Sequence, residues 1–154
     1  MPDGSIDRTA LELLSSCTCQ NLRQATRVVT QHYEQVLEPT GVKITQLPVL
    51  AAAASMGPIS MSRLAETLVM DRTTLTRNLQ PLERAGLVRV EAGSDRRARL
   101  VSATRQGLET LYAALPLWKQ AQSAMVEALG RFKWGVLMDN LRLTVDSTRK
   151  TSAD

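Results

Sequence analysis

The sequence predicts a mainly α-helical fold with one small two-stranded β element, and three observations lead to this prediction. Aromatic residues make up only 3% of the 154 residues, while alanine and leucine are abundant. This composition favours helices over strands. Apolar side chains recur at helical spacing through both ends of the chain. Between these flanks, residues 60–105 contain two short helical patterns and two short strand patterns around a run of arginines.

The N-terminal flank predicts one long helix followed by a shorter one. Over residues 8–37 most apolar positions are three, four or seven residues apart, and Pro39 and Gly41 then stop the helix. A second helix is expected to open after Thr45, to pass through an alanine run and to end near Gly57. The apolar positions of the long helix are Leu11, Leu14, Leu22, Ala25, Val29 and Val36.

The C-terminal flank predicts two further helices, over residues 104–129 and 131–149, which separate near Gly130. Pro116 lies inside the first of them and is expected to bend it. A helix of roughly thirty residues, as predicted at the N-terminus, is about 45 Å long, which exceeds what a small domain covers alone. We therefore expect the terminal helices to pack together in a two-fold dimer, with a monomeric bundle as the alternative.

The central segment begins with a predicted helix-turn-helix. Ser60 is a suitable N-cap for the first helix, Val69 and Met70 make the turn, and Asp71 is a suitable N-cap for the second helix. The apolar spacing gives each helix one inner face. These inner positions are Leu64, Ala65 and Leu68 in the first helix and Leu75, Leu79 and Leu82 in the second.

The second of these helices carries a polar face of a kind that suits the DNA major groove. Arginine can pair with guanine through two hydrogen bonds, glutamine can do the same with adenine, and threonine can meet a phosphate or a thymine methyl group. Free amides in the first turn would add a phosphate site. An ordinary solvated face is the alternative. The residues of this face are Thr73, Thr76, Arg77, Gln80 and Arg84. Pro81 is expected to bend only the C-terminal half of the helix, because the main reading residues lie N-terminal to it.

A basic hairpin is predicted directly after this helix. Gly86 ends the helix in a left-handed conformation. Strands are expected over residues 87–90 and 99–102. The tip between them carries Arg96, Arg97 and Arg99, with Asp95 placed to pair with Arg97 and support the hairpin. Arginine on a narrow hairpin can enter the minor groove, where the potential is most negative. A helix-turn-helix followed by such a wing is a winged helix.

Charge agrees with a nucleic-acid partner. Residues 60–105 hold nine arginines against five acidic residues, so this segment alone accounts for the chain's net charge of +4. A chain that gathers its excess positive charge on one compact segment is expected to meet a polyanion there. A winged helix used only for protein contacts is an alternative, but an acidic or neutral face would have favoured that use.

The central motifs resemble those of the MarR family of bacterial transcriptional regulators. The similar runs are DRTTLTRNLQPLERAGLV at 71–88 and DRRARLVSATRQG at 95–107. The second run matches the family's wing signature at Asp95, Arg97, Thr104 and Gly107, whereas Ala103 replaces the larger aliphatic residue usual there. The order of the predicted elements also fits. The resemblance implies a homodimer that binds a pseudo-palindromic operator with one winged helix per half-site, and usually a repressor that a small molecule or thiol oxidation releases.

On this reading the chain divides into three parts, and each part has candidate residues. An N-terminal dimerisation helix is expected at 1–40, a winged helix-turn-helix DNA-binding domain at 41–104, and C-terminal dimerisation helices at 105–154. The candidate DNA contacts are Ser62, Arg63, Arg72, Thr73, Thr74, Thr76, Arg77, Gln80, Arg96, Arg97 and Arg99, with Asp95 as wing support.

The resemblance places a pocket for a small-molecule effector, phenolic or aromatic, between the dimerisation helices and the winged domain. The candidate lining residues are His32, Tyr33, Met56 and Tyr112, for which plain packing is the alternative reading.

Cys17 and Cys19 are a second candidate sensor. If both lay on one helix they would point to nearly opposite sides and could not close a disulfide without unwinding it. No cation stands immediately beside them, Arg23 being the nearest on this helix, so we expect buried and inert thiols. Oxidant-sensing relatives nevertheless carry a reactive cysteine on the first helix, so a thiol-based sensor stays as the alternative.

Other classes find no support. We see no glycine-rich phosphate loop and no nucleophile–base pair around the single His32, so we expect no enzyme. One histidine cannot build a typical metal site, and we expect neither a metal nor another cofactor. No apolar run approaches the roughly 20 residues that span a bilayer, and the N-terminus lacks the features of a signal peptide. We expect a cytoplasmic protein that does not bind membranes.

Overall fold

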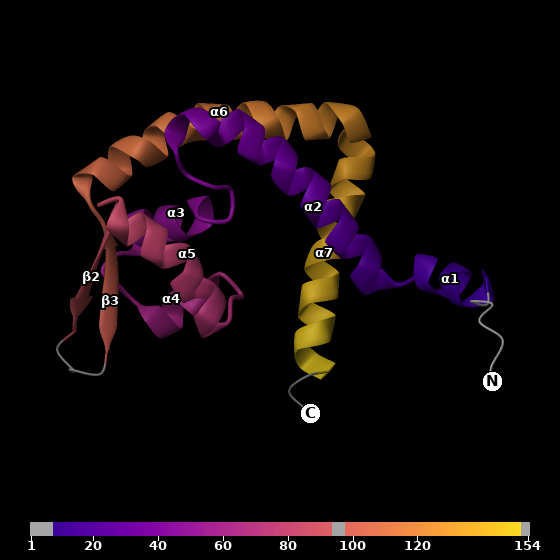
Figure 1. Cartoon of the computed structure of the whole chain (residues 1–154), viewed down its shortest axis with the longest axis horizontal. Helices are drawn as coiled ribbons and strands as arrows, with labels where there is room; N and C mark the ends of the chain where they lie inside the picture. Colours follow the sequence, from indigo (N-terminus) through magenta and orange to yellow (C-terminus); the bar gives the residue numbers. More distant parts are fainter. Residues whose placement is uncertain (1–7, 94–97, 152–154) are drawn as a thin grey trace, which may run out of the picture.

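The computed structural model describes residues 8–93 and 98–151, and these residues form a mainly helical chain (Figure 1). The helices are α1 (Arg8–Ser15), α2 (Thr18–Leu37), the 3₁₀ helix η1 (Glu38–Thr40), α3 (Leu47–Met56), α4 (Met61–Thr67), α5 (Arg72–Arg84), α6 (Arg105–Leu129) and α7 (Arg131–Thr151). The strands are β1 (Ile59–Ser60), β2 (Val88–Ala92) and β3 (Arg99–Ala103). The predicted helix boundaries after residue 40 are confirmed to within a few residues.

The N-terminal helix is not continuous, and the prediction of a single helix over 8–37 was wrong at this point. The backbone of Cys17 is extended, with φ −64° and ψ 118°, and separates α1 from α2. The hydroxyls of Ser15 and Ser16 donate to carbonyls of the preceding turn and so compete with the backbone amides for them. The side-chain amide of Asn21 donates to the carbonyls of both Ser15 and Cys17, at 2.8 and 2.9 Å, and holds the joint between the two helices.

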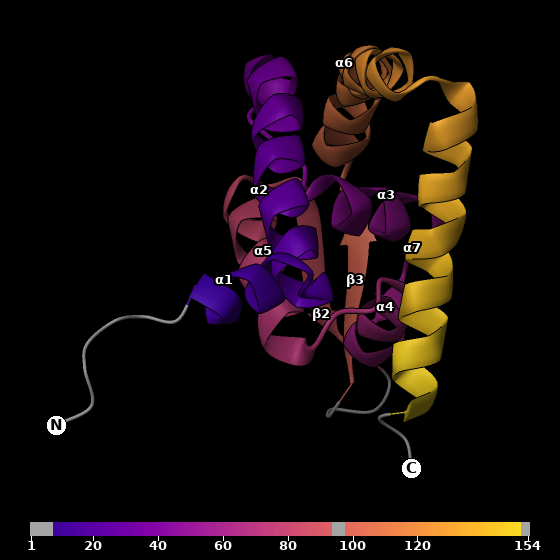
Figure 2. The same ribbon diagram turned by 90° about the vertical axis from the view of Figure 1, so that its right-hand side faces the viewer.

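Helices α2 and α6 lie side by side, and α7 turns away from the far end of α6 (Figures 1 and 2). Tyr33 and Leu37 of α2 and Ala114 and Ala121 of α6 are buried in this contact region. Helix α6 continues through Pro116 without a break. In α7 none of the side chains described, residues 131–149, is buried. The single chain therefore supplies little surface for α7 to pack against.

A second layer of packing gathers α3, α4 and α5 on the small sheet (Figure 1). The predicted inner face of the second helix is confirmed, because Leu75, Leu79 and Leu82 are buried. In the first helix Leu64 is buried, while Ala65 and Leu68 are only partly buried against the core. Helix α3 lies at the centre of this core, between α5, α6 and β3. The fully buried large side chains are Leu37, Val49, Leu50, Leu64, Leu75, Leu82 and Val101.

The sheet has three antiparallel strands in the order β1-β3-β2, not the two strands predicted. The predicted hairpin is present as β2 and β3, with Val90 opposite Val101. The additional strand β1 pairs Ile59 with Val101 and Ser60 with Leu100. A strand of two residues has no alternating pattern that a sequence can reveal, and only its partner in β3 defines it.

Both predicted helix caps of the helix-turn-helix are confirmed. The Ser60 hydroxyl accepts the Arg63 amide at 3.3 Å, and the Asp71 carboxylate accepts the Thr74 amide at 2.8 Å. Gly86, with φ 71°, follows α5 in the left-handed region as predicted. These side chains satisfy amides that the first turn of a helix leaves without partners, and they fix where α4 and α5 begin.

The turn between α4 and α5 holds Val69 in a left-handed conformation, with φ 54°. The amide of the next residue, Met70, donates to the Ala65 carbonyl at 2.9 Å and closes the turn. A β-branched residue at positive φ is a genuine outlier, and the left-handed region costs about 1–2 kcal/mol for a residue with a Cβ atom. The Val69 side chain is 54% exposed and offsets little of this cost by packing.

We predict that Val69→Gly raises the free energy of unfolding by about 0.5–1 kcal/mol. Glycine removes the clash of the Cβ atom, and the gain is reduced by glycine's greater freedom in the unfolded chain. Urea unfolding followed by circular dichroism measures the change. Val69→Ala is the matched control, because it keeps the Cβ atom and should gain little. An equal gain from alanine would mean that backbone strain at Val69 is not the cause.

Candidate nucleic-acid interface

The outward face of α5 is polar and lies opposite its buried leucines. Arg72, Thr73, Arg77 and Gln80 are exposed and Thr76 is half-buried, and together they line a shallow depression on the helix surface. The burial of Leu75, Leu79 and Leu82 fixes the rotation of the helix, so these polar side chains cannot turn inward. The structure thus brings together Thr73, Thr76, Arg77 and Gln80, whereas Arg84, exposed at the end of α5, does not line this depression.

A deeper groove of about 430 Å³ lies between α4, α5 and the sheet. Ser62 of α4, Arg72 of α5 and Arg99 of β3 all line it, although these residues are far apart in the sequence. Apolar side chains contribute to the lining as well. Glu83, near the C-terminal end of α5, also lines the groove and was not among the predicted site residues, because nothing in the sequence places it on a surface shared with α4 and the sheet. The remaining lining residues are Ser60, Met61, Ala65, Thr76, Leu79, Gln80, Val90 and Ala98.

The arginines of this surface are not neutralised within the chain. Arg63, Arg72, Arg77 and Arg99 form no ion pair with any residue that the structure describes. The ion pair next to them joins Arg89 and Glu91 at 3.4 Å, and both of its side chains are exposed. Four exposed guanidinium groups on neighbouring elements give this side of the molecule a positive potential that attracts anions.

The three threonines of α5 differ in what their hydroxyls already bind. The Thr74 hydroxyl donates to the Asp71 carboxylate at 2.6 Å, and the Thr76 hydroxyl donates to the Arg72 carbonyl at 2.7 Å. Thr73 makes no side-chain hydrogen bond to any described residue. Phosphate and carbonyl oxygens only accept hydrogen bonds, so of the three threonines Thr73 has its proton available for them.

The predicted phosphate site on the first-turn amides of α5 is not supported. The Asp71 carboxylate already occupies this end of the helix through the Thr74 amide. Hydrogen bonds from the Thr74 hydroxyl and amide lower the pKa of Asp71 below its ordinary value, which keeps the carboxylate ionised. A negative charge at the helix N-terminus disfavours a second anion there.

Part of the predicted wing lies outside the described residues. The wing residues concerned are Asp95, Arg96 and Arg97. On either side of them the hairpin is closed by a hydrogen bond of 2.7 Å from the Gly93 amide to the Ala98 carbonyl. Arg99 follows at the start of β3 and is exposed.

Two of the predicted effector residues fasten α2 to α6. His32 Nε2 lies 3.1 Å from the Ala121 carbonyl oxygen, and the Tyr33 hydroxyl donates to the side-chain oxygen of Gln122. Burial raises the pKa of the Tyr33 phenol. Met56, at the end of α3, is 42% exposed, and Tyr112 of α6 is 70% exposed, so neither is enclosed within the single chain.

The two cysteines are free and are not placed as expected. Cys17 is half-buried in the joint between α1 and α2, so the assumption that both thiols sit on one helix was wrong. Cys19 is exposed and not buried, because it faces a groove of about 610 Å³ between α2 and α7. Arg23 and Arg27 line the same groove.

Residues 8–93 and 98–151 contain neither a metal site nor a membrane-spanning helix. No three histidine, cysteine or acidic side chains lie close enough together to hold a metal ion. None of the helices in these ranges is long and apolar enough to cross a membrane.

Comparison with known proteins agrees with this geometry. Residues 40–98 match the model of the MarR family. A curated relative is the helix-turn-helix-type transcriptional regulator YwoH of Bacillus subtilis, which is 29% identical over 85 residues. That match covers 55% of this chain and spans 62% of the relative's length.

Solved structures resemble nearly the whole chain. The M. tuberculosis transcriptional regulator MosR in complex with DNA is 36% identical, with a TM-score of 0.73 over 87% of this chain and 99% of that chain. MosR without DNA gives 34% identity and a TM-score of 0.75, over 88% of this chain and 97% of that chain. The repressor CouR, bound to a 23-mer DNA duplex, gives 25% identity and a TM-score of 0.76, over 86% and 94% of the two chains. The family match, the observed winged helix-turn-helix and this extent of similarity show that the chain belongs to the MarR family of DNA-binding transcriptional regulators.

Proposed function

We propose that this protein is a homodimeric, cytoplasmic repressor that binds a pseudo-palindromic operator with one winged helix per half-site. The observation that carries the proposal is the surface on which Arg72, Arg77 and Arg99 stand without ionic partners beside Thr73 and Gln80. The similarity to MosR and CouR, whose structures include DNA, supports it further.

The chemistry of this surface suits α5 in the major groove. Arg77 would read guanine through two hydrogen bonds and Gln80 would read adenine, since both extend from the exposed side of α5. Arg72, Arg99 and Ser62, which line the groove beside α5, would contact the phosphate backbone and set the register. Arg96 and Arg97 remain candidates for the minor groove by their place in the sequence alone.

The proposed dimer is supported by the apolar surface that the terminal helices leave uncovered. Helix α7 has 21 residues, and a helix with so little packing on its own chain is marginal in water. Residues 1–40 and 105–154 would form the dimer, while 41–104 would bind DNA. The large exposed apolar side chains of α1, α2 and α7 are Leu13, Leu14, Leu22, Val28, Phe132, Val136, Leu137, Leu143 and Val145.

Two effector classes follow from two different observations. Met56 and Tyr112 are exposed in the single chain, where a partner and a phenolic or aromatic molecule could enclose them. Alternatively, Cys17 and Cys19 would form a disulfide, and one observation favours this candidate. Because Cys17 lies outside the helix, the two thiols are not held on opposite sides of one continuous helix. The two thiols would lose two protons and two electrons to hydrogen peroxide, which would leave as two water molecules.

We predict that Arg77→Ala lowers the preference for operator DNA by about 1–3 kcal/mol, because a base contact through two hydrogen bonds is lost. The measurement is the ratio of affinities for the DNA upstream of the protein's own gene and for unrelated DNA, at several salt concentrations. Affinity should fall steeply with salt, and Arg77→Lys should keep the parent's salt slope while losing preference.

Arg131→Ala is the matched control, since Arg131 is exposed at the start of α7, far from α5 (Figure 1). It should bind like the parent. A parent affinity that is independent of salt would overturn the proposed DNA binding. An unchanged preference in Arg77→Ala would remove only the assigned role of Arg77.

We predict that Leu143→Glu separates the dimer. Leu143 is 63% exposed on α7, and a charge buried against a second copy without a partner is strongly unfavourable. Sedimentation should give twice the chain mass of 16.9 kDa for the parent and a single chain for the variant. Val69→Glu adds the same charge at an exposed apolar position of the helix-turn-helix and should stay dimeric. A monomeric parent would contradict the proposed dimer.

We predict that one experiment separates the two effector classes. The parent bound to its upstream DNA is treated with hydrogen peroxide or with a series of phenolic compounds, and release is followed in a gel-shift assay. Release by a phenolic compound that persists in Cys17→Ser supports the ligand-binding repressor. Release by peroxide that disappears in both Cys17→Ser and Cys19→Ser, and returns on reduction, supports the thiol sensor instead.

A further inference from the structure

We propose that Thr104 is a positioning residue for DNA binding, because it joins the end of the recognition helix α5 to the start of α6. Thr104 follows β3 and precedes the first residue of α6. In the sequence it marks only the opening of a helix. In the fold it lies against the backbone that ends α5. This inference rests on the proposed DNA binding, and its test below distinguishes the two.

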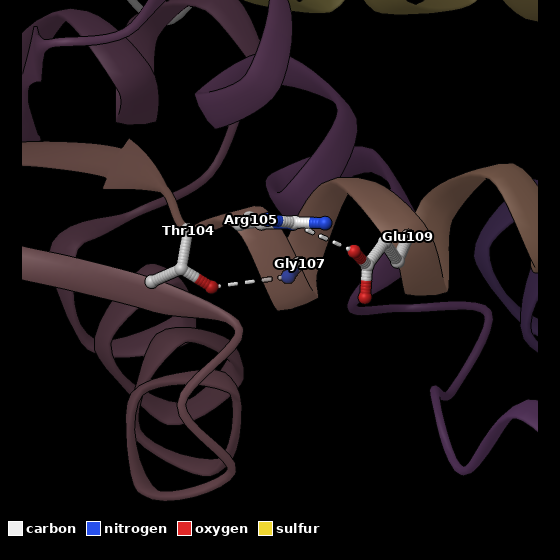
Figure 3. Close-up of polar contacts among 4 residues, drawn as sticks. All are labelled: Thr104, Arg105, Gly107 and Glu109. Carbon is white, nitrogen blue, oxygen red and sulfur yellow. Dashed lines mark hydrogen bonds and ion pairs between the residues drawn. The ribbon is translucent and has the colours of Figure 1, made fainter.

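The hydroxyl and the backbone amide of Thr104 make the joint, and Figure 3 shows the part of it at the start of α6. The Thr104 hydroxyl accepts the Gly107 amide at 3.0 Å, which caps α6. The same hydroxyl donates its proton to the Gly86 carbonyl at 2.6 Å, with the Leu87 carbonyl more distant at 3.2 Å. The Thr104 amide donates to the Leu87 carbonyl at 3.0 Å. Thr104 thus holds the first turn of α6 and, at the same time, Gly86 and Leu87, the second and third residues after α5.

At Gly107 the backbone of α6 lies directly against the Leu87 carbonyl, with no side chain between them. A Cβ atom added to Gly107 would lie 1.9 Å from the Leu87 carbonyl oxygen and 3.2 Å from Leu50 Cδ1. No larger residue therefore fits at 107 unless α6 moves away. Gly107 is the third residue of α6, so the first turn of this helix presses directly on the chain that leaves α5.

On the α5 side of the joint, hydrogen bonds hold Gly86 and Leu87 to the last turn of the helix. The Gly86 amide donates to the Glu83 carbonyl at 3.0 Å, and the Leu87 amide donates to the Leu82 carbonyl at 2.9 Å. Gly86 and Leu87 therefore continue the hydrogen bonding of α5. A displacement of the carbonyls that Thr104 holds is passed to the last turn of the recognition helix.

Helix α6 is long enough for small tilts to matter. Its 25 residues span about 38 Å, so a tilt of about 5° at its far end moves the joint by about 3 Å. One base-pair step along DNA is about 3.4 Å. Because α6 packs along α2 and leads into α7, changes among the terminal helices reach α5 through this joint. The neighbouring Arg105–Glu109 ion pair, at 3.0 Å, is exposed and lies within α6 (Figure 3), so it cannot join the two helices.

A simple capping role for Thr104 predicts different behaviour, and two substitutions separate the roles. Thr104→Ser keeps both the cap and the proton for Gly86. Thr104→Asp keeps the cap, since aspartate is among the best N-cap residues, but an ionised carboxylate cannot donate to the Gly86 carbonyl. If Thr104 only caps α6, the two variants behave alike.

The experiment measures the position of α5 relative to α6 directly. Spin labels are attached at Arg84→Cys on α5 and Lys119→Cys on α6, both exposed positions, in a chain that also carries Cys17→Ser and Cys19→Ser. Labelled chain is diluted with unlabelled chain, and pulsed electron resonance gives the distribution of label distances within one chain. Affinity for the protein's own upstream DNA is measured on unlabelled Thr104 variants, with circular dichroism melting as a check of folding.

We expect Thr104→Asp to broaden the distance distribution and to weaken DNA binding about threefold to tenfold, while Thr104→Ser retains both properties. A narrow distribution in Thr104→Asp, or a broad one with unchanged DNA affinity, would overturn the inference. If Thr104→Asp does not fold, Thr104→Ala is measured against the same criteria. A parent that binds no DNA would overturn the proposed function and with it the positioning role, whereas the label distances would still report whether the joint is rigid.

Discussion

The burial of one side of α5 is the constraint on which the rest of this structure depends. Leu75, Leu79 and Leu82 are spaced four and three residues apart, and all three are almost completely buried. Three contacts of this kind leave the helix no freedom to rotate about its axis, since any rotation would expose one leucine and open a void beside another. The direction in which Thr73 and Arg77 point is therefore a consequence of core packing, not of their own interactions.

What the outward side offers to a partner is determined by which groups are already satisfied. Local hydrogen bonds use the hydroxyls of Thr74 and Thr76, and the ionised Asp71 caps the first turn. The guanidinium groups of Arg72 and Arg77 remain without partners among the described residues. Guanidinium groups that stay in solvent carry no desolvation penalty in the free protein. They form their strongest hydrogen bonds when they meet phosphate or guanine. The hydroxyls of Thr74 and Thr76 thus serve the structure of the helix, while Thr73 and the arginines stay available for recognition.

The features that the sequence predicted correctly are local ones. Caps at Ser60 and Asp71 depend on residues three positions away, and the buried face of α5 depends on spacing within one helix, so a window of a few residues contains them. The features that it missed depend on distant partners. Strand β1 exists only because Val101 and Leu100 lie opposite it. The groove that unites Ser62, Arg72 and Arg99 likewise requires the complete fold. The break at Cys17 is an exception, since the serine hydroxyls that compete there are local, and the apolar spacing alone did not reveal it.

The same limit explains why the proposed dimer and the proposed joint belong to one argument. The core of the single chain includes side chains of α3, α4 and α5, but none of the α7 side chains from 131 to 149 is buried. In a homodimer the second copy would hold the terminal helices in place. The arrangement of the terminal helices would then set the position of one chain relative to the other. Thr104 and Gly107 lie where that arrangement meets the recognition helix, with backbone in contact with backbone at Leu87. A flexible connection there would let each α5 move independently, and the distance between two half-sites could not be read. If the protein reads that distance, the connection must be stiff, and a residue that holds both helices through a single hydroxyl is sufficient to make it so.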